Sequence, residues 1–239
     1  MKSPDRYIDE VIRNAFASPA DLERLEADLR AHFAEAEEKG EPMSRVIEDL
    51  GTPEEVAAAL TAEREIQFAG FCERVIAFVG DCGALLALAL PPLGLAVFLM
   101  TRVIPPDTRS NGWTLAVGAL GIAIFGLFVF YFPLLEARFG KTLGKHLLQI
   151  RVIRESGAPI SLGQAFVRRL SLYFEFLFID ALFVPFTQKN QRALDIVAQT
   201  IVAREPGSRP GWKGYVLCLL VPAGSLLALV SMFLLCSAN

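Results

Sequence analysis

An arginine and an aspartate stand inside one long apolar stretch, AGFCERVIAFVGDCGALLALAL, which covers residues 69–90. Arg74 lies near its beginning, and Asp81 follows seven positions later. Seven positions make almost two turns of a helix, so both side chains point to the same side, with Asp81 about 10 Å further along the axis. An ionised carboxylate within a membrane-spanning helix costs roughly 3 kcal/mol, so Asp81 must be paired, protonated or in contact with water.

A buried carboxyl group of this kind can have two roles. It can hold a proton or a hard cation, because such cations prefer carboxylate and carbonyl oxygens, and Glu175 and Asp180 are then candidate contributors. It can instead be a protonated or hydrogen-bonded group that fixes helix packing. The sequence leaves both interpretations of Asp81 open, and it contains no cluster of metal ligands.

The composition indicates a membrane protein. Of 239 residues 53% are hydrophobic and 18 are Phe, and the mean hydropathy is +0.43, which is too apolar for an ordinary soluble domain. Charge divides the chain, because residues 1–70 carry 8 Lys and Arg against 17 Asp and Glu, whereas residues 71–239 carry 15 against 9. The basic residues lie between apolar runs, where membrane topology explains them, so we expect no nucleic-acid partner.

The first 65 residues predict a small acidic helical domain on the cytosolic side. Three short helices are expected, with boundaries at Ser18-Pro19, Gly40 and Gly51. A fourth helix follows Thr52, whose side chain and that of Glu55 can each bond the other residue's backbone N–H.

Three runs are long enough to span a bilayer, which takes about 20 apolar residues in a helix. They cover residues 75–100, 113–135 and 215–236. Pro91-Pro92 interrupt the first run, so a kink or tilt is expected there. We therefore expect an all-α membrane protein with three clear transmembrane helices, and we see no internal repeat.

The connector after the second run is the most basic part of the chain. Between residues 136 and 170 it holds Arg138, Lys141, Lys145, Arg151, Arg154, Arg168 and Arg169. The positive-inside rule places this connector, and with it the N-terminus, in the cytoplasm. We expect Lys141, Lys145, Arg168 and Arg169 to contact lipid headgroups. The segment LLQIRVIR alternates like a strand and a turn follows it, which predicts a short β-hairpin-like piece.

A fourth apolar segment, residues 170–187, is short and carries Glu175 and Asp180. If it spans the membrane, the basic residues that follow it lie outside, against the positive-inside rule. If it enters and returns, those residues stay in the cytoplasm, but backbone at that depth must then be covered by protein or water. We favour the re-entrant alternative and keep the spanning one open.

Two parts of the chain resemble known families. The pattern EDLGTPEEVAAAL makes residues 5–62 similar to the HAAS domain, a small helical cytosolic module fused to membrane segments. Arg74, Asp81, GKTLGKHLLQIRVIRESGAPIS and QRALDIVAQTIV with Asp195 together resemble the RDD family over about residues 69–203. That family is named for one arginine and two aspartates, which match Arg74, Asp81 and Asp195. It commonly has His and Gly where this chain has Leu194 and Gln199.

The RDD resemblance implies transport, and sodium/proton exchange is suggested for some members. We accordingly expect a cytosolic domain at residues 1–65, an RDD-like membrane domain at 66–205 and a further transmembrane helix at 206–239. The expected function is cation or proton transport by a homo-oligomer in the plasma or inner membrane, with Asp81 as the buried site. The axial offset makes a direct pair of Arg74 with Asp81 strained, so we expect Arg74 to pair with Asp195.

The alternative function is that of a membrane-anchored signalling or scaffold protein whose residues 1–65 bind a cytosolic partner. An enzyme is not expected, because the sequence offers no nucleophile with an adjacent base, and His32 and His146 stand alone. We expect no cofactor.

Overall fold

The computed structural model describes residues 3–62, 66–100, 111–173, 183–208 and 211–237. Its backbone clusters into two compact units. Unit 1 comprises Met1–Gly70 and Gln149–Arg209, and unit 2 comprises Phe71–Leu148 and Pro210–Asn239. Unit 1 therefore joins the N-terminal helices to the second half of the connector, a grouping that the expected three-part division does not contain.

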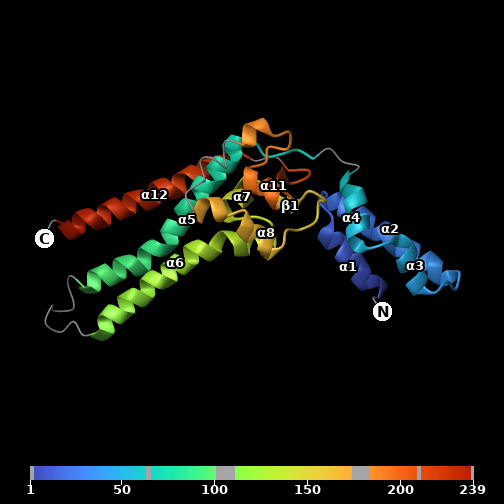
Figure 1. Ribbon diagram of the computed structural model, residues 1–239, viewed down its shortest axis with the longest axis horizontal. Helices are drawn as coiled ribbons and strands as arrows, with labels where there is room; N and C mark the ends of the chain where they lie inside the picture. Colours follow the sequence, from blue (N-terminus) through green and yellow to red (C-terminus); the bar gives the residue numbers. More distant parts are fainter. Residues whose placement is uncertain (1–2, 63–65, 101–110, 174–182, 209–210, 238–239) are drawn as a thin grey trace. The chain divides into compact units, whose positions relative to one another are not determined.

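Unit 1 begins with four helices (Figure 1). They are α1 (Pro4–Asn14), α2 (Pro19–Glu38), α3 (Met43–Leu50) and α4 (Pro53–Ala62). Ser18 caps α2 by accepting a hydrogen bond from the backbone N–H of Asp21 at 3.3 Å. Thr52 and Glu55 form the expected reciprocal pair, with distances of 2.8 and 3.2 Å between each side chain and the other residue's backbone nitrogen.

These four helices enclose an apolar core of their own. Tyr7 and Val11 are fully buried, and Phe33 packs edge-on against Tyr7 with the ring centroids 5.9 Å apart. The Tyr7 hydroxyl donates to the carbonyl of Gly51 at 3.0 Å, and burial raises the pKa of this phenol. Gly51 ends α3 with a φ of 84°, a conformation in which glycine meets no Cβ penalty.

A two-stranded antiparallel sheet forms the second part of unit 1. Strand β1 (Ile150–Arg154) pairs with β2 (Thr200–Arg204), and Val152 lies opposite Val202. The strand predicted from LLQIRVIR is therefore confirmed, and an isolated bridge from Ile153 to Pro159 gives the hairpin-like return. The main partner, β2, was not predicted, because it lies far along the chain.

The two strands are preceded by the same local structure, 50 positions apart. Helix α7 (Leu143–Leu147) leads through Gln149 into β1, and helix α11 (Ala193–Val197) leads through Gln199 into β2. Both glutamines adopt the left-handed conformation, with φ of 54° and 53°. Because the pair at the centre of the sheet, Val152 and Val202, also differs by 50 positions, the two helix–strand segments form an internal repeat that sequence inspection missed.

The N-terminal helices and the sheet share a second apolar cluster. Phe16, in the link between α1 and α2, is buried with Ile153, Ile201 and Ala203 of the two strands. Gly157 approaches α4 so closely that a Cβ there would lie 2.5 Å from the Thr61 hydroxyl oxygen. The N-terminal part of the chain is thus packed against the connector rather than separated from it by a free linker.

Shorter elements complete the connector. They are α8 (Leu162–Val167), α9 (Leu170–Tyr173) and the 3₁₀ turn η3 (Val184–Phe186). Ser161 and Gln164 form a capping box at the start of α8. Glu175 and Asp180 lie outside the described residues, so whether residues 170–187 span or re-enter stays a prediction.

Unit 2 contains three helices that are long and apolar enough to cross a membrane. They are α5 (Phe71–Phe98), α6 (Asn111–Phe139) and α12 (Trp212–Ser237), which confirms the three expected spans. Helix α5 packs along α12 and against the short α7, and it continues through Pro91 and Pro92 (Figure 1).

Glycines allow the close packing within unit 2. A Cβ on Gly83 of α5 would lie 2.5 Å from the backbone nitrogen of Pro222 on α12. A Cβ on Gly214 of α12 would lie 2.2 Å from the carbonyl oxygen of Leu147 in α7. Close backbone approach of this kind is how membrane helices gain packing energy, since lipid supplies little hydrophobic drive between them.

We predict that Gly214→Ala lowers the stability of the protein by about 1–3 kcal/mol, because the added methyl group must displace backbone rather than a flexible side chain. Gly224→Ala is the matched control on the same helix, since a Cβ there meets nothing within 4 Å. Thermal unfolding of both variants in detergent, followed by circular dichroism, measures the difference. Equal melting temperatures for the two variants would contradict the packing of α12 on α7.

Candidate functional site

Asp81 lies on α5 and is 1% exposed. Its carboxylate accepts three hydrogen bonds within unit 2. The Tyr131 hydroxyl donates to Oδ1 at 3.0 Å, the Thr142 hydroxyl to Oδ2 at 2.6 Å, and the backbone N–H of Gly144 to Oδ1 at 2.8 Å. Asp81 therefore contacts α6 through Tyr131 and the beginning of α7 through Thr142 and Gly144.

The contacts with α7 are those of a helix cap supplied from another helix. Thr142 is the N-cap residue of α7, but its hydroxyl does not cap its own helix and donates to Asp81 instead. The first amides of a helix have no partner within it, and an acceptor oxygen near them stabilises the helix. Asp81 provides that acceptor for Gly144, while the Tyr131 oxygen accepts from the N–H of Leu143 at 3.4 Å.

Gly144 is required for this arrangement on steric grounds. A Cβ at this position would lie 2.0 Å from the carbonyl oxygen of Ala77 on α5. Only a residue without a side chain lets the first turn of α7 come close enough for its N–H to reach Asp81.

A buried ion pair lies beside these contacts. Lys145 of α7 and Glu136 of α6 are 2.5 Å apart, with side chains 9% and 0% exposed. The Lys145 ammonium also interacts electrostatically with Asp81. Two carboxylates and one ammonium thus gather where α5, α6 and α7 meet, and we call Asp81, Glu136 and Lys145 the carboxylate cluster.

The other family aspartate, Asp195, lies in unit 1 and is fully buried. Its carboxylate pairs with Arg168 at 3.3 Å and with Arg192 at 3.1 Å. Arg168 is 1% exposed and donates a second bond to the Thr200 hydroxyl at 2.7 Å. Asp195 therefore joins the end of α8 to α11 and β2.

A polar network borders the Asp195 pair. The Gln191 side chain donates to Glu155 at 2.8 Å and to the carbonyl of Thr200 at 3.0 Å. The hydrogen bond from Gln191, together with Lys189 at 3.1 Å, holds the pKa of Glu155 below its usual value. Gln191 was not singled out from the sequence.

Several expected contacts differ from those observed. Lys145, Arg168 and Arg169, expected at lipid headgroups, are buried side chains with exposures of 8%, 1% and 5%. Lys145 is bound by the Glu136 carboxylate, and Arg168 is bound by the Asp195 carboxylate and the Thr200 hydroxyl. The charge of a residue in the sequence does not show whether such a partner exists within the protein. The headgroup role of Lys141 stays a prediction.

Arg74 is half-buried in the first turn of α5, in unit 2, whereas Asp195 belongs to unit 1. Their pairing stays a prediction. Next to Arg74, Glu73 is buried and accepts a hydrogen bond from the Tyr215 hydroxyl of α12 at 3.2 Å.

Sequence reasoning identified Asp81 and missed its partners. Tyr131 stands in an apolar run, where a phenol is easily taken for an interfacial or packing residue. Thr142 stands in GKTLGK beside the conspicuous lysines. The available signal was the need for donors: a buried carboxylate requires hydroxyl or N–H groups, and these are scarce in the spans.

Fold and site define the class of protein. In unit 2, two of the three apolar helices, α5 and α6, carry the carboxylate cluster together with the short α7. In unit 1, the N-terminal helices pack on the two-stranded sheet. This is a multi-span α-helical membrane protein with a helical N-terminal domain.

Two family models match the chain, and both agree with this class of protein. The model of the RDD family matches residues 68–199, more than half of the chain, and the chain belongs to that family. The HAAS model matches residues 6–59. Both matches confirm the resemblances stated from the sequence. No curated protein and no solved structure matches the chain.

We predict that Asp195→Asn destabilises the protein by about 3–5 kcal/mol, because it removes the carboxylate charge that pairs with the buried Arg168 guanidinium at 3.3 Å. The control is Asp49→Asn, since Asp49 is 75% exposed in its ion pair. Thermal unfolding in detergent, together with the yield of folded protein, measures the effect. If both variants melt at the same temperature, the Asp195 pair contributes nothing to stability.

Proposed function

We propose that the protein is a cation or proton transporter of the plasma or inner membrane, a non-enzymatic role in which Asp81 binds the moving proton or ion. One observation carries the proposal. Asp81 is buried in an apolar helix and takes its hydrogen bonds from neutral donors, while the nearby Lys145 ammonium is held by Glu136. Ionisable groups placed inside membrane helices typically mark ion or proton pathways.

If Asp81 takes up a proton, the donor pattern accommodates it on Oδ2 rather than on Oδ1. Oδ1 accepts from Tyr131 and from the Gly144 N–H, which is a fixed donor, whereas Oδ2 accepts from the Thr142 hydroxyl alone. A carboxylic acid needs an acceptor for its own O–H, and a hydroxyl can turn from donor to acceptor. A proton on Oδ2 is therefore accommodated by rotation of the Thr142 hydroxyl, without breaking the bond from Gly144.

The positive-inside rule supports a cytoplasmic N-terminus and connector. Three long helices and one short segment are few for a transporter, and alternating access usually draws on repeated halves, so the proposal implies a homo-oligomer.

We predict that Asp81→Asn reduces flux at least tenfold, because asparagine keeps the size of the side chain but cannot take up a proton. The measurement uses proteoliposomes that contain a pH-sensitive dye, with imposed pH, sodium or potassium gradients. Asp49→Asn makes the same chemical change on the surface and should keep the wild-type flux. Wild-type flux in Asp81→Asn, or no flux in the wild type under any gradient, would overturn the proposal.

A second candidate function is signalling or scaffolding through residues 1–65. The observation that favours it is the packing of Phe16 on Ile153 and Ile201, since a partner bound to the N-terminal helices would then act on a domain joined to the RDD connector.

We predict, for this alternative, that a photo-crosslinking amino acid at position 28, an exposed aspartate of α2, gives a discrete protein adduct in cells. The full-length chain is used, and position 162 on α8, 45% exposed, is the control. Mass spectrometry identifies the adduct. Failure of exposed positions on α1, α2 and α3 to give any adduct would contradict a scaffold role.

A further inference from the structure

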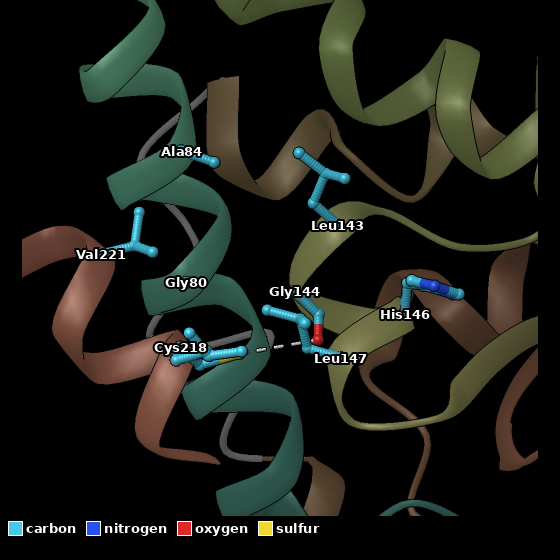
Figure 2. Close-up of a pocket in the computed structure, with 9 residues that line it drawn as sticks. Gly80, Ala84, Leu143, Gly144, His146, Leu147, Cys218 and Val221 are labelled. Carbon is cyan, nitrogen blue, oxygen red and sulfur yellow. Dashed lines mark hydrogen bonds between the residues drawn. The ribbon is translucent and has the colours of Figure 1, made fainter. Parts of the chain in front are cut away.

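A small apolar pocket opens on unit 2 where α5, α7 and α12 meet. Its volume is about 170 Å³. Figure 2 shows Gly80 and Ala84 on α5, Cys218 and Val221 on α12, and Leu143 on the α7 side around this space. Nearly all of its lining surface is carbon.

Water is a poor occupant for such a pocket. A buried water needs two to four polar partners, and apolar cavities of roughly 150 Å³ stay dry and bind hydrocarbons. Of the polar groups that line the pocket, the Cys218 thiol donates to the Gly144 carbonyl oxygen at 3.7 Å (Figure 2), and the His146 side chain is the other.

The position of the pocket along the helices indicates which hydrocarbon could occupy it. Gly80 lies roughly 13 Å along α5 from its first residue, and Cys218 roughly 9 Å along α12 from its first residue, at 1.5 Å per residue. The pocket is therefore within the apolar length of both helices rather than at their ends. Leu217 and Leu143 also line it and are 45% and 54% exposed, so in a bilayer acyl chains could reach the pocket past them.

We propose that this pocket binds one acyl chain of a membrane phospholipid. The chain occupies the space between α5, α7 and α12 that the side chains lining the pocket leave unfilled. The inference does not depend on transport by Asp81. It gives the protein a structural lipid whose binding wall includes Gly144, the residue that donates to Asp81.

The test compares Ala84→Phe, which fills the pocket from α5, with Ala123→Phe, which makes the same change on the exposed surface of α6. Full-length protein is depleted of lipid in glyco-diosgenin, whose rigid sterol body cannot enter as a flexible chain does. Dioleoyl phosphatidylglycerol, dioleoyl phosphatidylcholine or oleic acid is then added back. Native mass spectrometry counts bound lipid, and thermal unfolding measures its effect.

We predict that the wild type and Ala123→Phe each retain one phospholipid with either headgroup and melt at a higher temperature with it. Ala84→Phe should show at least tenfold lower occupancy and no lipid-dependent increase. Lipid retained equally by Ala84→Phe and Ala123→Phe, or no retained lipid in the wild type, would overturn the proposal. Retention of phosphatidylglycerol alone would also overturn it, since a headgroup would then decide binding. If Ala84→Phe does not fold, Val221→Phe fills the same pocket from α12.

Discussion

The architecture of the membrane unit depends on satisfying one carboxylate in an apolar setting. Asp81 is 1% exposed, so its oxygens need donors from the protein, and it obtains them from two other helices. Each of those contacts constrains a different element: Tyr131 fixes the end of α6 beside α5, and Gly144 fixes the beginning of α7. A buried carboxylate without hydrogen-bond partners would be costly, so the contacts of Asp81 stabilise the packing of α5, α6 and α7 against one another.

Close backbone packing is the second requirement, and it follows from the first. A hydrogen bond of 2.8 Å from the Gly144 N–H to Asp81 is possible only if α7 lies almost in contact with the backbone of α5, next to Ala77. On its other side α7 is held by α12, where Gly214 meets the carbonyl of Leu147. Gly80 likewise lets Cys218 of α12 approach α5, since a Cβ there would lie 2.9 Å from the Cys218 sulfur.

Sequence patterns predicted the elements with local signals and missed those that arise only in three dimensions. The caps at Ser18 and Thr52 and the three spans depend on short-range chemistry or on runs of apolar residues, and all are present. The pairing of β1 with β2 and the donors to Asp81 depend on residues that are far apart in the chain, so no local pattern contains them. The repeat of α7–β1 and α11–β2 was missed because its match is short. Gln149, Val152, Arg154 and Glu155 recur 50 positions later as Gln199, Val202, Arg204 and Glu205, but no residue of α7 recurs in α11.

The two interpretations of Asp81, as an ion site and as a packing contact, are compatible with each other in this geometry. Helix α7 has five residues, and a helix so short has almost no stability of its own. It forms because Asp81 accepts from its first turn, so the group that would bind a proton is also the group that holds α7 in place. Two residues beyond α7 the chain enters β1, where the sheet begins. Under the proposed function, a proton on Oδ2 would turn the Thr142 hydroxyl at the beginning of α7 while the Gly144 N–H stays bound to Oδ1, so α7 would keep its place through the change of charge.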